Sequence, residues 1–256
     1  MDFLNSIILL TNFIIVPGIT YGSQLALGAI GVTLIYGVLR FANFAYGDLM
    51  AFGTMVVILM TWYLQSKGIS FGLLPTALLA LPIGILLTIA VSLFFDKTVF
   101  EYYRNKKSNP VTFIVVSLGI MFVLNAVVRI IIGPNDINFM DGHKFIMKAR
   151  EFKQLTGLNE GLAIKSTQVI TLVTTIITCS ILFYFLNKTK TGKSMRAYSN
   201  NEDLALLSGI DPKKIVLITW VIVSILATVA GTLYGLDKSF KPFTYFNNLL
   251  PIFAAT

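Results

Sequence analysis

The chain has 256 residues, of which 55% are hydrophobic and only 12% are charged, and its mean hydropathy is +0.79. Soluble domains carry about 25% charged residues, so this composition excludes an ordinary soluble domain and indicates a membrane protein. The net charge of +8 does not indicate nucleic-acid binding, because the Lys and Arg residues fall in short loops between apolar runs, as in cytoplasmic loops of membrane proteins.

Six apolar runs follow one another along the chain, and most are long enough to cross a hydrocarbon core of ~30 Å as helices. The sequence therefore predicts an all-α integral membrane protein, a polytopic helical bundle with at least six spans. One run is short, and for it we expect a tilted, broken or partly re-entrant span packed inside the protein. The runs lie at 19–39, at 49–64 (the short one), at 69–95, 111–132, 167–187 and 215–236.

The N-terminal stretch 3–18 ends at Pro17-Gly18, and we expect it to form an interfacial helix rather than a separate short span. The start of the chain lacks the positive region and the small-residue cleavage site of a secretory signal, so we expect it to be retained. The chain ends at LLPIFAAT, within a further apolar run. We therefore expect one transmembrane domain over 1–256 that is incomplete at its C-terminal end.

Two basic loops, 96–110 and 188–214, are separated by two spans and so lie on the same side of the membrane. Because Lys and Arg accumulate in cytoplasmic loops, we place both loops in the cytoplasm and the loop 133–166 outside. The first of the six runs then starts outside, and Arg40 at its end faces the cytoplasm.

The second basic loop contains TGKSMRAYSNNEDLALLSGIDPKK, a polar insert between two apolar runs. Ser199 followed by Glu202 fits a capping box, and Glu202 and Asp203 then lie in a first helical turn, where the macrodipole favours anions. Leu204 and Leu207, with Ala205, give a small apolar face. The insert therefore predicts a short amphipathic helix.

This short helix has a predicted end as well. Gly209 is placed to terminate it in the left-handed conformation. Asp211-Pro212 then begins the next helix, with proline at its first position. A solvated loop with incidental helix signals is the alternative interpretation.

Two further patterns suggest ligand sites, an ATP site and a metal site, but the residues do not support either. Gly192-Lys193-Ser194 imitates the end of a phosphate-binding loop, but Asn187 stands where the first glycine belongs and an apolar helix precedes it instead of a strand. We therefore expect no directly bound ATP. One histidine, His143, and one cysteine, Cys179, supply too few ligands for a metal site.

The insert resembles the cytoplasmic loop of permeases in the branched-chain amino acid ABC importer family. The family pattern G-R-x-x-R-A, then E-D, then L-x-G-I is matched by Gly192, Arg196-Ala197, Glu202-Asp203 and Leu207–Ile210. A second block, LALGAIGVTLIYGVLRFANFAYGDLMAFGT at 25–54, is similar to the family's N-terminal signature. Tyr46 departs from that signature, because histidine is usual there, so no pH sensing is attached to this position.

The resemblance implies a permease subunit of an ATP-driven importer in the bacterial inner membrane, with no enzymatic activity of its own. It implies a second permease subunit, favouring a heterodimer, two cytoplasmic ATPases that use the ATP, an extracytoplasmic solute-binding protein and membrane lipid as partners. The insert would couple the permease to the ATPases, as a short rigid helix suits docking into a groove. The residues expected to do so are Gly192, Lys193, Arg196, Ser199, Glu202, Asp203, Leu204, Leu207 and Gly209.

The signature segment RFANFAYGD is expected to form a special turn near the pathway, with structural support favoured over substrate contact. Its residues are Arg40, Asn43, Phe44, Tyr46, Gly47 and Asp48. Asn43 is expected to cap or to bond between helices, Gly47 to admit irregular backbone, and Asp48 to anchor Arg40 or a backbone N–H.

Asn125 and Arg129 lie one helical turn apart near the outer end of the fourth run. An arginine there is costly in lipid unless it snorkels or faces a cavity. Snorkelling is the favoured interpretation, and attraction of a substrate carboxylate is the more specific functional alternative.

Other functions stay open on the residues alone. An ion-coupled secondary carrier commonly uses intramembrane carboxylates, and the six runs contain no Asp or Glu away from their ends. A membrane enzyme would need clustered nucleophiles, bases or metal ligands. Within the family, branched-chain amino acids, other amino acids, urea and short amides are all candidate substrates.

Overall fold

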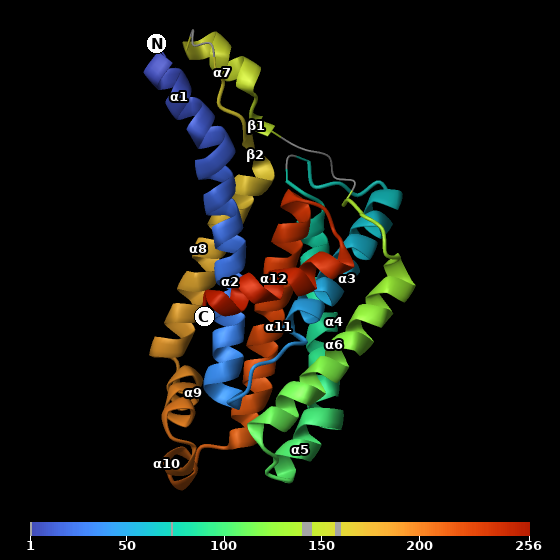
Figure 1. The fold of residues 1–256 in the computed structure, drawn as a ribbon, viewed down its shortest axis with the longest axis vertical. Helices are drawn as coiled ribbons and strands as arrows, with labels where there is room; N and C mark the ends of the chain where they lie inside the picture. The colour runs from blue at the N-terminus through green and yellow to red at the C-terminus, as the bar shows by residue number, and fades with distance from the viewer. Residues whose placement is uncertain (1, 73, 140–144, 157–159) are drawn as a thin grey trace.

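The computed structural model describes residues 2–72, 74–139, 145–156 and 160–256; His143 lies outside this part of the chain. Six helical stretches in it are long and apolar enough to cross a membrane: Phe3–Leu39, Tyr46–Ser66, Ala77–Asn105, Pro110–Ile132, Ser166–Lys188 and Pro212–Asp237. They run up and down a single bundle (Figure 1). The predicted polytopic all-α membrane fold is confirmed.

The first half of the bundle is α1 (Asp2–Leu10), η1 (Thr11–Ile15, a π-helical turn), α2 (Val16–Leu39), α3 (Tyr46–Ser66), α4 (Ala77–Phe95), η2 (Asp96–Phe100, also π-helical), α5 (Glu101–Asn105) and α6 (Pro110–Ile132). The second half is β1 (Phe145–Met147), α7 (Ala149–Thr156), β2 (Ile164–Lys165), α8 (Ser166–Lys188), α9 (Lys190–Asn200), α10 (Glu202–Leu207), α11 (Pro212–Asp237) and α12 (Pro242–Ala254). Strands β1 and β2 pair antiparallel.

The N-terminal prediction was wrong, because residues 3–39 form one helical stretch and not an interfacial helix followed by a span. The reason lies at η1, where the Val16 N–H donates to the Thr11 carbonyl in the wider π pattern. Pro17 stands at the second position of α2, directly after this π-helical turn, so the bonding irregularity of the helix coincides with the residue that has no N–H to donate. The same π-helical turn holds the outer loop, because Asn12 donates to the Gly161 carbonyl over 2.7 Å and accepts from the Ala163 N–H over 3.1 Å.

Helices α3 and α11 form the centre of the bundle. In each, 72% of the most apolar 18-residue window is buried, compared with 28% or less in the other spans. Their contact is close at Gly231, where a Cβ atom would lie only 2.8 Å from the Met50 carbonyl oxygen. Small residues permit such approach between membrane helices. The predicted interior position of the 49–64 run is confirmed, although the helix is unbroken.

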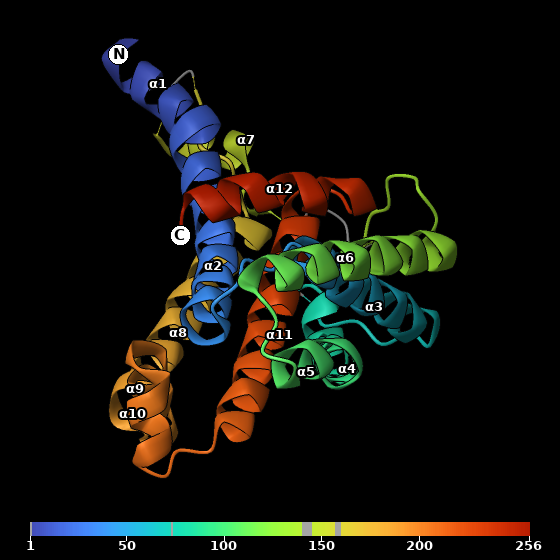
Figure 2. The same cartoon turned by 60° about the horizontal axis from the view of Figure 1, so that its bottom comes forward.

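The two basic loops lie at the same end of the molecule, with α5, α9 and α10 at the foot of Figure 1. The N-terminus, α7 and the two strands lie at the opposite end. This arrangement agrees with the prediction that 96–110 and 188–214 share a side. Helix α12 crosses α2 and α11 at a steep angle in Figure 2, and it contacts α2, α3 and α6.

Candidate functional site

The polar insert forms two consecutive helices, α9 and α10, at the basic end of the bundle. The predicted capping box was wrong: Ser199 lies inside α9, and Asn201 caps α10 by accepting from the Leu204 N–H over 3.0 Å. Asparagine serves this position because its side chain reaches the free amides of the first turn. Glu202 and Asp203 do occupy that first turn, as predicted.

The apolar residues of α10 point in two directions, one toward the protein and one toward solvent. Ala205 is buried and packs in a small cluster with Val38, Met195, Tyr198 and Ile215. Leu204 and Leu207 point away from the protein, with 61% and 85% of their surface exposed. The predicted apolar face is therefore divided, and its two leucines form an unpartnered surface at the tip of the molecule.

The ends of α10 are fixed by local backbone geometry. Gly209 follows the helix with φ +79°, the left-handed conformation predicted for a terminator. Asp211 then caps α11 by accepting from the Lys213 N–H over 2.9 Å, and Pro212 begins α11, as predicted. The short helix is consequently held at a defined angle between α9 and α11.

The remaining residues of the predicted coupling segment lie on α9. Gly192 is buried where a Cβ atom would meet the Phe185 carbonyl oxygen, and Lys193 is exposed. Arg196 donates from Nη1 to Asn187 Oδ1 over 2.8 Å. Both cations therefore face solvent beside α10.

Ser199 connects the insert to the signature segment. Its hydroxyl donates to the Gly37 carbonyl over 2.7 Å, and its carbonyl accepts from Nη2 of Arg40. Arg40 ends α2 in the left-handed conformation, with φ +62°. That conformation costs a non-glycine residue about 1–2 kcal/mol. The two blocks that carry the family resemblance in the sequence are thus in direct contact.

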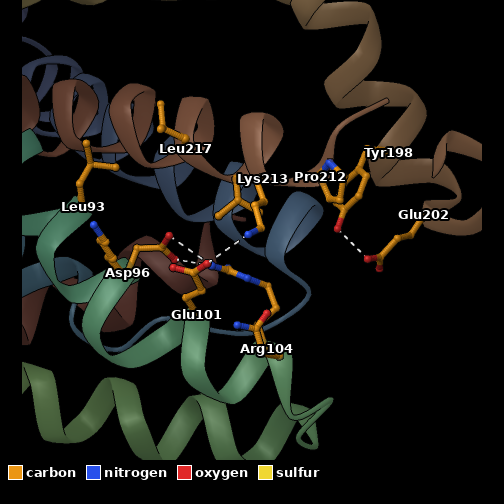
Figure 3. Close-up of a pocket in the computed structure, with 12 residues that line it drawn as sticks. Leu93, Asp96, Glu101, Arg104, Tyr198, Glu202, Pro212, Lys213 and Leu217 are labelled. Atoms are coloured by element: carbon orange, nitrogen blue, oxygen red, sulfur yellow. Dashed lines mark hydrogen bonds and ion pairs between the residues drawn. The ribbon is translucent and has the colours of Figure 1, made fainter. Parts of the chain in front are cut away.

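A cavity of about 470 Å³ separates α10 and the start of α11 from α4, η2 and α5 (Figure 3). Tyr198 donates to Glu202 Oε1 over 2.7 Å at one side of it. Burial, together with this hydrogen bond, raises the pKa of the Tyr198 hydroxyl above its usual range. The phenol therefore stays protonated and keeps Glu202 as its acceptor.

Asp96 joins the other side of this cavity to α11. Its carboxylate accepts from Arg104 Nη2 over 2.9 Å and from the Trp220 indole N–H over 2.8 Å. Lys213 adds an ion pair with Glu101 at 3.6 Å. Sequence reasoning missed Asp96 and Trp220; the signal was a carboxylate at the end of one span and a lone indole inside another.

The signature segment turns back into the protein after α2, so α3 begins inside the bundle and not at its end (Figure 1). Asn43 is buried and its Oδ1 accepts from the Ala45 N–H over 3.0 Å, a bond within the turn. The N-cap of α3 is Ala45, without a side-chain cap bond, so this bond is neither the predicted cap nor a bond between helices. The Phe44 N–H donates to Ser117 Oγ of α6 over 3.1 Å. The irregular backbone of this turn is therefore satisfied by protein groups, as membrane depth requires.

Tyr46 and Gly47, the first two residues of α3, are both packed against neighbouring helices. Tyr46 is fully buried against Gly31 of α2, and its hydroxyl has no hydrogen-bond partner among the described residues. Gly47 was expected to admit irregular backbone, but it lies within α3 and permits the approach of α12, since a Cβ atom would be 2.7 Å from the Tyr245 carbonyl oxygen.

The prediction for Asp48 was wrong in its partner. Its Oδ1 accepts from Asn125 Nδ2 of α6 over 2.7 Å, whereas Arg40 bonds to Ser199. Asp48 lies in the first turn of α3, at the end of that span, yet it is 0% exposed because this turn lies inside the bundle.

Arg129 is exposed, and its guanidinium carbon lies 5.8 Å from the centre of the Phe243 ring of α12. The guanidinium therefore lies near α12, and the snorkelling interpretation stays a prediction. Among the described residues, no group of three His, Cys, Asp or Glu side chains is arranged to hold a metal ion.

Comparison with known proteins agrees with this architecture. The chain is 27% identical over 222 residues to the high-affinity branched-chain amino acid transport system permease protein LivH of Escherichia coli, covering 85% of this chain and 68% of LivH. It is 26% identical over 232 residues to the permease protein BraD of Pseudomonas aeruginosa, covering 87% and 70%. A probable LivH of Methanocaldococcus jannaschii is 28% identical over 251 residues, covering 96% and 73%.

No solved structure matches the chain significantly. The model of the family described as "Branched-chain amino acid transport system / permease component" matches residues 14–256, which is nearly the whole chain. The protein, a multi-pass membrane protein, therefore belongs to the branched-chain amino acid transport system permease component family.

Proposed function

We propose that the protein is a permease subunit of an ATP-driven importer of branched-chain or related amino acids in the bacterial inner membrane. Family membership supports transport, and the names of the relatives support the substrate class. In this proposal a second permease subunit completes the pathway, a binding protein delivers the amino acid, and two ATPases supply the energy without ATP being bound by this chain.

The observation that carries the proposal is the exposed pair Leu204 and Leu207 on a capped helix at the basic end of the bundle. Two leucines exposed side by side on a short, rigid helix suit insertion into a groove of a partner protein. Because α10 is fixed to α9, α11 and, through Ser199, to α2, movement of a docked ATPase would be passed to three helices of the bundle.

A pull-down in mild detergent tests the ATPase contact. The tagged permease is co-expressed with its transport partners, and co-purifying proteins are identified by mass spectrometry and assayed for ATP hydrolysis. We expect the unaltered protein to retain an ATPase and the double variant Leu204→Ser, Leu207→Ser to lose at least nine-tenths of it. Asp203→Lys, which reverses a charge in the same first turn, should weaken capture in the same direction.

Phe183→Ser is the matched control, because Phe183 of α8 is 72% exposed but lies on the face of a span. It should retain the ATPase fully. If the unaltered protein captures no ATPase under conditions that preserve other membrane complexes, the importer proposal is wrong. Equal capture by the double leucine variant would move the docking surface away from α10.

A further inference from the structure

Asp48 carries an unpartnered polar atom in the interior of the described structure. Its Oδ1 is held by Asn125, but its Oδ2 is buried and has no hydrogen-bond partner. Buried polar atoms are almost always paired, so such an atom needs an explanation. A charged or a protonated carboxyl would be equally unsatisfied at Oδ2, since neither a donor nor an acceptor lies within reach. A ligand that donates a hydrogen bond there would remove this cost.

The position of Asp48 on α3 favours a ligand-binding role for this carboxylate over a purely structural one. Helix α3 begins inside the bundle, and Asp48 lies in its first turn, where the helix dipole stabilises a carboxylate. In secondary transporters, helices interrupted at membrane depth form the substrate site. An ionisable residue at this depth is expensive and usually functional.

Arg129 supplies the opposite charge beside this carboxylate. It lies four residues after Asn125 on α6, a spacing that puts Cβ atoms roughly 5–6 Å apart on the same helix face. Its charge interacts favourably with Asp48. Asn125 is partly exposed and Arg129 is exposed, whereas Asp48 is fully buried, so the polar residues of this edge of α6 lead from the surface toward the carboxylate. Polar residues on one edge of a membrane helix are compatible with a water-lined path or a subunit contact.

We infer that Asp48, Asn125 and Arg129 form a site for a zwitterion: Asp48 Oδ2 accepts from an α-ammonium group, Asn125 fixes the carboxylate through Oδ1, and the Arg129 guanidinium binds the α-carboxylate. This inference rests on the proposed function, because it places the amino acid at one point of the pathway. The site recognises the backbone groups that all amino acids share, so it would accept side chains of several sizes and leave their selection to other contacts.

Three probes of similar shape test the predicted ammonium-binding and carboxylate-binding ends of the site on the unaltered protein. L-leucine has both charged groups, leucinamide keeps the ammonium group only, and 4-methylpentanoate keeps the carboxylate only. The purified transporter complex, without binding protein, is titrated with each probe at millimolar concentration, and the midpoint of thermal unfolding is followed. Binding to the folded state raises this midpoint. We expect L-leucine to raise it most and each single-pole probe to raise it less.

Variants test whether Asp48 binds the ammonium group and Arg129 binds the carboxylate. Asp48→Asn keeps the size of the side chain and an acceptor for Asn125, and it should abolish the leucinamide response while weakening L-leucine at least tenfold. Arg129→Gln should abolish the 4-methylpentanoate response and leave leucinamide bound. Asp136→Asn and Arg150→Gln make the same chemical changes at the outer end and should respond as the unaltered protein does.

The outcomes separate this inference from the proposed function. If no probe shifts the midpoint of a complex that performs ATP-driven leucine uptake with its binding protein, the zwitterion site is wrong and the importer stands. Unchanged responses in Asp48→Asn would also overturn the site. If the unaltered complex performs no leucine uptake, the proposed substrate fails, whereas probe binding that depends on Asp48 would still support the site. Should Asp48→Asn fail to fold, the comparison of the three probes on the unaltered protein decides.

Discussion

Arg40 at the end of α2 bonds to the backbone of Ser199 at the end of α9, 159 residues later in the chain. Ser199 returns a bond from its hydroxyl to Gly37 over 2.7 Å. The helix that presents Leu204 and Leu207 is therefore connected to the turn that leads into α3 and Asp48. A displacement of α10 would reach the centre of the bundle through this pair of bonds, with no need for a longer chain of contacts.

Removing the Ser199 hydroxyl tests this connection. Ser199→Ala should lower the free energy of unfolding by about 1 kcal/mol, the usual net value of one hydrogen bond. In a chain of this size that corresponds to a fall of about 2–4 °C in the thermal midpoint. ATP-driven uptake should fall more than ATP hydrolysis, since the bond joins the two regions.

Ser194→Ala is the control for this change, because the Ser194 hydroxyl bonds within its own helix to the Lys190 carbonyl. It should change neither the midpoint nor the ratio of uptake to hydrolysis. A proportional loss of uptake and hydrolysis in Ser199→Ala would show that the bond supports stability alone.

The Trp220 indole gives a second prediction. Trp220→Phe keeps the ring that stacks on Phe100 but removes the N–H that donates to Asp96. Leaving a partly buried carboxylate with one donor fewer should cost about 1–3 kcal/mol of unfolding free energy. Denaturation in detergent, followed by circular dichroism, measures the loss.

Trp62→Phe provides the contrast, because the buried Trp62 N–H has no partner in the described structure. Its removal should be neutral or stabilising, since an unsatisfied donor disappears. Equal losses in the two variants would mean that ring volume, and not the bond to Asp96, determines the effect.

Close packing at Gly231 gives a third prediction. In Gly231→Ala the new Cβ would lie 2.8 Å from the Met50 carbonyl oxygen, and backbone cannot move aside as a side chain can. The change should destabilise the α3–α11 contact by about 1–3 kcal/mol, as overpacking does. The thermal midpoint of the purified protein is the measurement.

Gly119→Ala is the matched variant on α6, where a Cβ atom would meet nothing within 4 Å. Alanine in a helix interior is favoured over glycine by about 0.5–1 kcal/mol, so the midpoint should rise slightly. If both glycines tolerate alanine equally, the closeness of α3 and α11 does not limit stability.

Local signals predicted the elements well, since spans, the left-handed Gly209 and the Pro212 start of α11 depend on nearby residues only. The wrong predictions concern features that tertiary contacts determine. Asn201 caps α10 because Ser199 is engaged with Gly37 and Arg40, which no local pattern reveals. Continuity through Pro17 depends on a π-helical turn stabilised by the outer loop.

The candidate site was predictable in its residues but not in their pairing. Asp48 and Asn125 were both singled out in the sequence, yet their contact joins positions 77 residues apart on different helices. The burial of Asp48 also depends on where α3 begins, and this is set by the turn after α2. Hydropathy assigns a carboxylate at the edge of an apolar run to the membrane surface, because it cannot detect a helix that starts in the interior.

The helical stretch Phe3–Leu39 has 37 residues, and at 1.5 Å per residue it is about 55 Å long. The hydrocarbon core is ~30 Å thick, and even a tilt of 40° would leave this helix about 12 Å too long for it. Part of it must consequently stand in the headgroup layer or above it, and its N-terminal part carries the Asn12 bonds to Gly161 and Ala163. Because Asn12 binds Gly161 and Ala163, the position of this helix across the bilayer also sets the height of the loop segment that contains them.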